Sequence, residues 1–536
     1  MNFKKILAII TVLIFILSFT AFADEIDQGT LLTPYSKDYN KYTNNPFGYE
    51  IVLPNSLELN EDIISVKSRF ESEELVIDIL YDNFYNDQNN RSTYINYGNR
   101  GILNNPAFKI TGEYNHNFNG INGHITLYER AKIEDGELDR NYYAMITFAR
   151  SYKELITVFM KSAQPLYIEH IMPSFKLIDK TGTMKQDAVF EPVEKNFDEQ
   201  TKDFYDKYFN NNEKVDFGIF EPTYPIYAYK LGQLEDMFDY EFPVVLLYNS
   251  FQLPYKTEYM DQAKKDGKVV EYGLYTVDTI DGVEKDISLE IIEGKYDDYL
   301  NNLAQSFNEY DYPVLFRLNN EMNGEWVWYS SHKIGKDTDL FIECWRYIYN
   351  KFKENGVDNL IFVWNPNEKS FPNFAYNHYL NYYPGNEYVD VVGLTAYNTG
   401  NYYKGEIWRS FNEAYDHFYY DYVKHFNHPM MITEFSGASK GGNKAQWFDD
   451  MFNKISKYDR IKMAVLWNGQ DYDTSKTEKT VSRNYRLDLE EDVINSVRNG
   501  LQNYKWFYFI FRRALCSPKF FRHIYCWYFI NNVIMY

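Results

Sequence analysis

The stretch PVLFRLNNEMNGEWVWYS, residues 313–330, changes character within a few positions. Its apolar start, Val314 to Phe316, predicts a short buried β-strand. Polar residues follow at once, and two tryptophans and a tyrosine come directly after them. Active sites of parallel α/β folds lie at the carboxyl ends of their strands. The stretch therefore predicts a strand that delivers Arg317 and Glu321 to a site lined with aromatic rings. The alternative is a strand that ends in an ordinary polar loop.

Eight such apolar runs alternate with helical patterns along the second half of the chain. This alternation favours a (β/α)8 TIM barrel over residues 197–503, with a doubly wound open sheet as the alternative. A helix is expected at 338–356, with Thr338 as its N-cap and Gly356 as its end, and others at 227–238 and 489–503. The strands are expected at 216–220, 244–248, 269–275, 314–318, 360–364, 389–394, 430–435 and 462–467.

Residues 24–180 have a different pattern, with strand-like runs separated by turns rich in asparagine and glycine. A smaller α+β domain is expected here, mostly antiparallel, with a closing helix at 164–175. Binding to carbohydrate, cell surface or wall is one role for this domain, and a plain structural role is the other. Residues 181–196 lose periodicity and are expected to be a linker. The strands are expected at 49–54, 75–81, 123–128, 142–148 and 155–160.

Composition excludes some partners. The 536 residues carry a net charge of -21, which argues against nucleic acid and anionic membranes, because both attract clustered lysine and arginine. Aromatic residues make up 19% of the chain, a high share that suits stacking of rings on sugars. The three cysteines do not support a disulfide framework, and Cys344 is expected to be a buried core thiol. No motif for a metal or cofactor is found.

The two ends of the chain stand apart from these domains. Residues 1–23 combine two lysines, an apolar run and Ala21-Phe22-Ala23, which predicts a signal peptide and a secreted protein. A retained membrane anchor is the alternative. Residues 504–536 are aromatic and basic and contain no acidic residue. We expect this tail to lie outside the fold, with attachment to a membrane surface as the alternative.

Several ordered motifs resemble those of one enzyme family. FRLNNEMNGEWVWY (316–329) is similar to the acid/base signature of glycoside hydrolase family 26, a clan A barrel family whose best-known members are β-mannanases. MMITEFSGAS (430–439) is similar to the segment that carries the family's nucleophile. The resemblance extends over about residues 214–502 through three further motifs: GKYDDYL (294–300), FVWNPN (362–367) and YPGNEYVDVVGLTAYN (383–398).

The resemblance implies roles for particular side chains. Glu321 would be the general acid/base and Glu434 the nucleophile of a retaining glycosidase, which holds its two carboxyl groups about 5–5.5 Å apart. Trp326 should border Glu321 and raise its pKa, while Arg317 and Tyr397 should keep Glu434 ionised. Trp326 and Trp467 would form the platform of the subsite where the bond breaks.

One residue departs from the family pattern. Mannanases of this family usually carry histidine directly before the acid/base glutamate, and this chain has Asn320. Asparagine at that position is used by the wider clan to bind the sugar 2-hydroxyl, whose orientation distinguishes mannose from glucose. The expected function is a secreted retaining endo-β-glycanase without cofactor or metal, with a mannan-type polysaccharide favoured. The alternatives are a β-1,3/1,4-glucanase, a xylanase, an exopolysaccharide hydrolase, or an inactive carbohydrate-binding protein.

Overall fold

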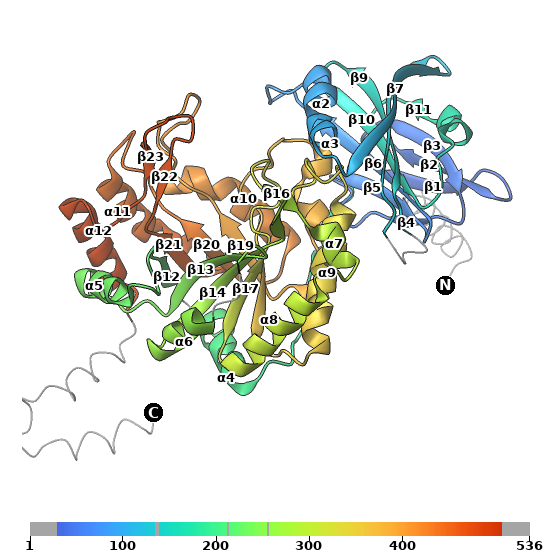
Figure 1. Cartoon of the computed structure of the whole chain (residues 1–536). Helices are drawn as coiled ribbons and strands as arrows, with labels where there is room; N and C mark the ends of the chain where they lie inside the picture. Colours follow the sequence, from blue (N-terminus) through green and yellow to red (C-terminus); the bar gives the residue numbers. More distant parts are fainter. Residues whose placement is uncertain (1–28, 134–138, 212–213, 254–256, 506–536) are drawn as a thin grey trace, which may run out of the picture.

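A computed structural model describes residues 29–133, 139–211, 214–253 and 257–505 (Figure 1). The expected signal peptide, and the expected tail beyond residue 505, lie outside these ranges. The described chain forms two parts: antiparallel sheets at its N-terminal end, and a closed barrel of eight parallel strands after them. This arrangement confirms the expected fold class. Within the described ranges, no helix has the length and apolar character needed to span a membrane.

The N-terminal part consists of two antiparallel sheets. The four-stranded sheet has the order β1 (Thr30–Pro34), β2 (Tyr39–Asn44), β3 (Tyr49–Pro54) and β11 (Lys176–Leu177). The seven-stranded sheet has the order β4 (Glu58–Asn60), β5 (Lys67–Glu71), β6 (Leu75–Asn83), β10 (Glu154–Ser162), β9 (Tyr142–Ser151), β8 (Ile121–Arg130) and β7 (Phe108–Phe118). Aromatic side chains join the sheets, since the ring of Tyr42 in β2 meets that of Phe70 in β5 at a centroid distance of 5.0 Å.

The prediction of a helix at 164–175 is wrong. Two short 3-10 turns, η1 (Ile168–His170) and η2 (Met172–Ser174), stand in its place. Pro173 explains the difference, because proline lacks a backbone N–H and disfavours helical geometry in the residue before it. The helices of this part are instead α2 (Arg91–Gly98) and α3 (Arg100–Asn104), between β6 and β7. The capping box of α2, formed by Asn90 and Thr93, was not recognised in the sequence.

The barrel strands lie where the apolar runs predicted them. They close in the order β12 (Asp216–Phe220), β13 (Val244–Ser250), β14 (Val269–Tyr275), β17 (Val314–Leu318), β18 (Leu360–Trp364), β19 (Val391–Thr395), β20 (Met430–Phe435) and β21 (Ile461–Trp467). The strand positions agree because both faces of a parallel sheet are buried, which gives each strand a continuous apolar run. Two short hairpins, β15 (Val277–Ile280) with β16 (Val283–Asp286) and β22 (Gln470–Tyr472) with β23 (Val481–Asn484), lie outside the barrel.

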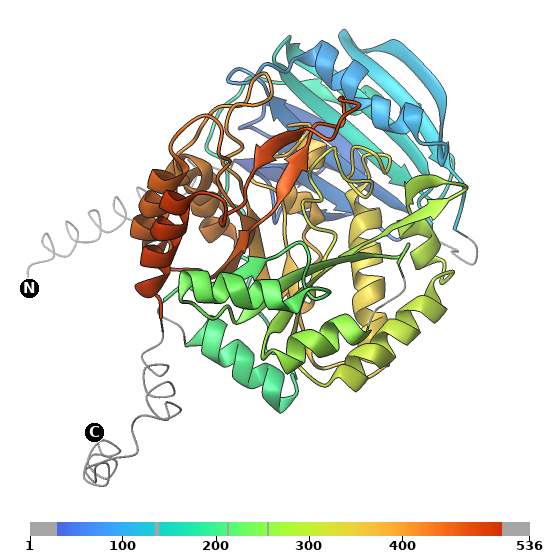
Figure 2. The same ribbon diagram turned by 60° about the vertical axis from the view of Figure 1, so that its left-hand side comes forward.

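Helices alternate with the barrel strands along the chain. They lie around the outside of the barrel (Figure 2). The expected N-cap of α9 is wrong by one residue, since the side chain of Asp337, and not Thr338, accepts the backbone N–H of Asp339. The principal helices are α4 (Glu199–Tyr205), α5 (Ala228–Phe238), α6 (Thr257–Lys265), α7 (Ser288–Ile292), α8 (Asp297–Tyr310), α9 (Thr338–Glu354), α10 (Phe411–His425), α11 (Lys444–Lys454) and α12 (Glu491–Gln502).

Two segments at the expected domain borders are in contact with the barrel. In the expected linker 181–196, Phe190 forms a parallel bridge with Phe426, and Asp187 accepts a hydrogen bond from His425 at 3.0 Å. At the other end, Tyr504 is buried, and its hydroxyl donates to the carbonyl of Phe452 at 2.9 Å. The packed chain therefore continues past residue 503.

Candidate active site

The turn after β17 presents the first carboxyl group of the site. Asn319 and Glu321 both have left-handed backbone geometry, with φ of 49° and 54°. Such values are uncommon for residues other than glycine and cluster at functional sites. Two contacts hold the turn: the Asn319 side chain accepts the backbone N–H of Thr276 at 2.8 Å, and the Glu321 backbone N–H donates to the carbonyl of Asn365 at 2.7 Å. The chain thereby leaves the strand abruptly and places the Glu321 carboxyl at the barrel rim.

The second carboxyl group lies near the end of β20. The pairing register of β20 shifts around Glu434 on both sides, and such bulges redirect side chains at barrel rims. Glu434 is 6% exposed and accepts a hydrogen bond from Arg317 Nη2 at 3.0 Å. The Tyr248 hydroxyl, at the end of β13, donates to the same carboxyl oxygen. Two donors, one of them charged, therefore hold the Glu434 carboxyl group in place.

Arg317 is fully buried and is surrounded by polar groups from neighbouring strands. Its Nε lies 3.1 Å from the carboxyl of Glu271 in β14, and its Nη1 donates to Asn365 Oδ1 at 3.3 Å. Burial raises the pKa of Glu271 to about 8, although Arg317 opposes that change. Gly273 leaves room for this packing, because a Cβ there would lie 3.2 Å from the ring of Tyr248 and 3.7 Å from Arg317 Nη2. Arg317 therefore lies between two carboxyl groups, those of Glu271 and Glu434.

Glu321 has a contrasting environment. Its carboxyl accepts one hydrogen bond from Asn367 Nδ2 at 2.6 Å and another from the indole Nε1 of Trp326 at 3.1 Å. Burial raises the pKa of Glu321 to about 7, and the nearby carboxylate of Glu434 acts in the same direction. The two hydrogen bonds and the charge of Arg317 oppose the rise without cancelling it. A group of this pKa can hold a proton near neutrality and release it during a reaction.

Aromatic rings border both carboxyl groups. Trp467, at the end of β21, stacks on Phe220 with a centroid distance of 5.2 Å and an angle of 13°. Tyr397 meets Trp467 edge-on at 6.1 Å and packs on Tyr485 at 5.0 Å. On the Glu321 side, Trp326 remains 48% exposed. The site therefore offers apolar ring surface next to its acids.

Asn320 has an unsatisfied polar atom. The residue is 6% exposed, and its Oδ1 has no hydrogen-bond partner in the part of the chain that the structure describes. A buried acceptor of this kind is costly unless it is paired. A donor supplied by a bound molecule would satisfy it.

Of the seven side chains expected in the site, Arg317 contacts Glu434, Trp326 contacts Glu321 and Tyr397 contacts Trp467, while Asn320 directly precedes Glu321 in the chain. Sequence reasoning missed three further contributors: Tyr248, Glu271 and Asn367. The phenol that donates to Glu434 is that of Tyr248, the last residue of the run expected as strand 244–248, whereas Tyr397 contributes its ring to the aromatic border. Tyr248 could have been found in the same way as the other residues, because it lies at the carboxyl end of an expected strand. A charged residue inside the apolar run VVEYGLY was the signal for Glu271.

Within the described residues, no group of three or more histidine, cysteine, aspartate or glutamate side chains could hold a metal ion. The carboxyl groups of the site are instead engaged by Arg317, Tyr248, Asn367 and Trp326.

The closed barrel carries one acid, Glu321, in the turn after its fourth strand and another, Glu434, near the end of its seventh, an arrangement similar to that of barrel glycosidases. Residues 270–488 match the model of glycosyl hydrolase family 26. The match extends from β14 through the hairpin of β22 and β23 and includes both Glu321 and Glu434.

Curated relatives align with part of the chain. Endoglucanase H of Acetivibrio thermocellus is 32% identical over 193 residues, which are 35% of this chain and 21% of that protein. Mannan endo-1,4-beta-mannosidase of Bacillus subtilis strain 168 is 30% identical over 205 residues, 36% of this chain and 50% of that protein. Beta-1,3-xylanase TXYA of a Vibrio species is 23% identical over 257 residues, 44% of this chain and 50% of that protein. The matches thus span half of these relatives or less.

Among solved structures, the catalytic domain of a Bacillus sp. JAMB-750 endo-beta-1,4-mannanase is similar with a TM-score of 0.43 and 17% identity. The match covers 59% of this chain and 92% of the mannanase domain.

Proposed function

We propose that the protein is a secreted retaining endo-β-glycanase that hydrolyses a β-linked polysaccharide, with a mannan-type substrate favoured. The observation that carries the proposal is the contrast between the two carboxyl groups. Glu321 has a pKa raised to about 7, while Glu434 is held by Arg317 and Tyr248. Two nearby acids with such different environments are the requirement for an acid and a nucleophile in one site.

In this mechanism the proton starts on Glu321. As the glycosidic bond breaks, Glu321 gives its proton to the leaving oxygen, and Glu434 forms a bond to the anomeric carbon. The resulting glycosyl ester is then cleaved by water, whose proton returns to Glu321 and whose oxygen ends on the sugar. Arg317 and Tyr248 orient the attacking oxygen of Glu434, while Trp326 and Asn367 orient Glu321. The unpaired Oδ1 of Asn320 would accept a sugar hydroxyl.

The preference for mannan rests on the relatives, among which mannan endo-1,4-beta-mannosidases are frequent. Other relatives are named as a β-1,3-xylanase and an endoglucanase. Xylan and glucan are therefore the polymers to compare with mannan. The test is hydrolysis of soluble β-1,4-mannan, β-1,3-xylan and mixed-linked β-1,3/1,4-glucan by the full chain, measured as reducing ends released. Mannan is expected to give the highest kcat/KM.

The roles of the two acids are tested by substitution. Glu321→Ala and Glu434→Ala are each expected to abolish polymer hydrolysis without loss of the folded state, checked by circular dichroism. Azide is expected to restore turnover of an activated glycoside by Glu434→Ala, with a glycosyl azide of inverted configuration as the product. Full activity in Glu434→Ala would contradict the assignment. Binding of a polymer by the parent chain without any turnover would instead indicate a carbohydrate-binding protein.

A further inference from the structure

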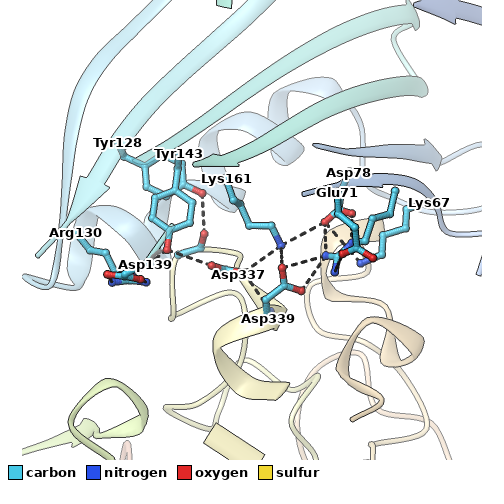
Figure 3. Close-up of polar contacts among 12 residues, drawn as sticks. Lys67, Glu71, Asp78, Tyr128, Arg130, Asp139, Tyr143, Lys161, Asp337 and Asp339 are labelled. Carbon is cyan, nitrogen blue, oxygen red and sulfur yellow. Dashed lines mark hydrogen bonds and ion pairs between the residues drawn. The ribbon is translucent and has the colours of Figure 1, made fainter. Parts of the chain in front are cut away.

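The N-terminal sheets are fixed to the barrel by a buried cluster of charges (Figure 3). Lys161 of β10 lies 3.2 Å from Asp337 and 3.4 Å from Asp78, and it also contacts Asp339. Arg69 of β5 bridges Asp78 and Asp339 at 2.7 and 2.8 Å. Removal of one partner from a buried pair costs about 3–5 kcal/mol. The cluster therefore holds the sheets in one position relative to the start of α9.

The same face of the N-terminal part binds the loop that carries the acid. Asn105 Nδ2 and the Tyr128 hydroxyl donate to the backbone carbonyls of Lys333 and Gly335 at 2.9 and 2.7 Å. The Tyr97 hydroxyl donates to the carboxyl of Glu325, four residues after Glu321. The N-terminal part thus contacts the loop between β17 and α9, and Tyr97 lies close to the catalytic rim.

A groove of about 930 Å³ lies at this junction. Asp87, Asn89 and Tyr97 line it from the N-terminal part. The barrel contributes three walls: Asn323 and Glu325 after β17, residues 368–373 after β18, and the outer face of α10. Most of this lining consists of amide, hydroxyl, carboxyl and aromatic groups, which suits a ligand rich in hydroxyl groups.

The groove begins next to the acid. Phe371, 42% exposed, lines the groove, and its ring centroid lies 5.5 Å from that of Trp326, whose indole N–H donates to Glu321. Asn323 connects the same region by accepting the backbone N–H groups of Asn367 and Phe371, each at 2.8 Å. A chain bound at Glu321 and passing over Trp326 would therefore reach Phe371 and enter the groove.

We propose that this interdomain groove binds the part of an uncharged β-glycan that extends beyond the catalytic centre, so that the N-terminal part is a section of the substrate-binding surface. The inference rests on the proposed function for its occupant. The lining contains five carboxyl groups (Asp87, Glu325, Glu368, Asp416 and Asp421) against two lysines (Lys369 and Lys424), and this excess of negative charge disfavours an anionic polysaccharide. The N-terminal wall lies outside residues 270–488, which match the family.

The test uses the full chain and compares long with short substrates. Asn89→Arg fills the groove from the N-terminal side, and Phe371→Ala removes a ring from the barrel side. Each is expected to lower the ratio of kcat/KM on the preferred polymer to kcat/KM on its tetrasaccharide by about fivefold to tenfold, since a short chain fills fewer contacts. Asn55→Arg, an exposed turn position outside the groove, and Tyr229→Ala, an exposed ring on α5, are the matched controls and should leave the ratio unchanged.

A binding measurement separates this inference from the proposed function. Retention of Glu434→Ala in gels containing the three polymers is compared with retention of the same variant carrying Asn89→Arg. Weaker retention with Asn89→Arg supports the groove even where the parent chain hydrolyses none of the polymers, a result that would overturn the proposed function alone. The proposed role of the groove would be overturned if the parent chain hydrolyses a polymer and both groove variants keep its ratio of kcat/KM on the polymer to kcat/KM on the tetrasaccharide. A parent chain that neither hydrolyses nor binds any of the polymers would overturn both.

Discussion

The raised pKa of Glu321 has a consequence for stability that can be measured without a substrate. An acid whose pKa is higher in the folded than in the unfolded protein stabilises the fold fully below the unfolded value, and this contribution is lost as pH rises through the folded value. For Glu321 the two values are 4.5 and about 7. The folded protein is therefore expected to lose stability at this residue between about pH 4.5 and 7.

The size of the effect follows from the two values. A pKa difference of about 2.5, at 1.36 kcal/mol for each pKa unit, corresponds to about 3 kcal/mol. In Glu321→Gln the side chain is neutral at every pH and keeps the shape of the protonated acid. The variant's free energy of unfolding relative to the parent is thus expected to rise by about 3 kcal/mol from pH 4 to pH 8. If the amide itself changes the free energy of unfolding, that change is the same at pH 4 and at pH 8, so the expected rise is unaffected.

The assay is urea unfolding followed by tryptophan fluorescence at pH 4, 5, 6, 7 and 8 for the parent and Glu321→Gln. Titration of groups that lie far from Glu321 cancels in the difference between the two proteins. Glu478→Gln, at an exposed position, is the control and should give a difference that does not change with pH. A difference for Glu321→Gln that stays flat, or that grows toward low pH, would refute the reasoning about burial and Glu434.

Three further predictions concern the neighbours of the two acids and the end of the barrel. Asn367→Ala removes a hydrogen bond that favours the carboxylate form of Glu321, so the alkaline limb of kcat/KM against pH should move up by about one unit; a downward move would contradict it. Tyr248→Phe removes a donor to Glu434 and should lower kcat/KM by about tenfold to a hundredfold in steady-state kinetics, with an unchanged rate as the contrary result. Tyr504→Ala empties a buried position and should lower the free energy of unfolding by about 3 kcal/mol in urea titrations, whereas a neutral effect would show that the barrel ends at residue 503.

The sequence by itself determined the barrel and the positions of its acids. Parallel strands are buried on both faces, so each appears as a continuous apolar run, and five of the eight expected ranges equal the strands of the structure. The motifs around Glu321 and Glu434 identified two strand ends, because a carboxyl group near the end of a buried strand, or shortly after it, has few positions other than the rim. These signals are local, and each is complete within about ten residues.

Contacts between distant segments were decided only by the tertiary structure. The donor to Glu434 is Tyr248, 186 residues away in the chain, and the burial of Glu271 against Arg317 depends on the closure of the barrel. The N-terminal part gave the weakest prediction, since its additional strands are short or polar and its capping box was overlooked. Its position at the loop of Glu321 depends on charges such as Lys161 and Asp339, 178 residues apart. No local pattern encodes such a pairing, because its free energy arises only when folding removes both groups from water together.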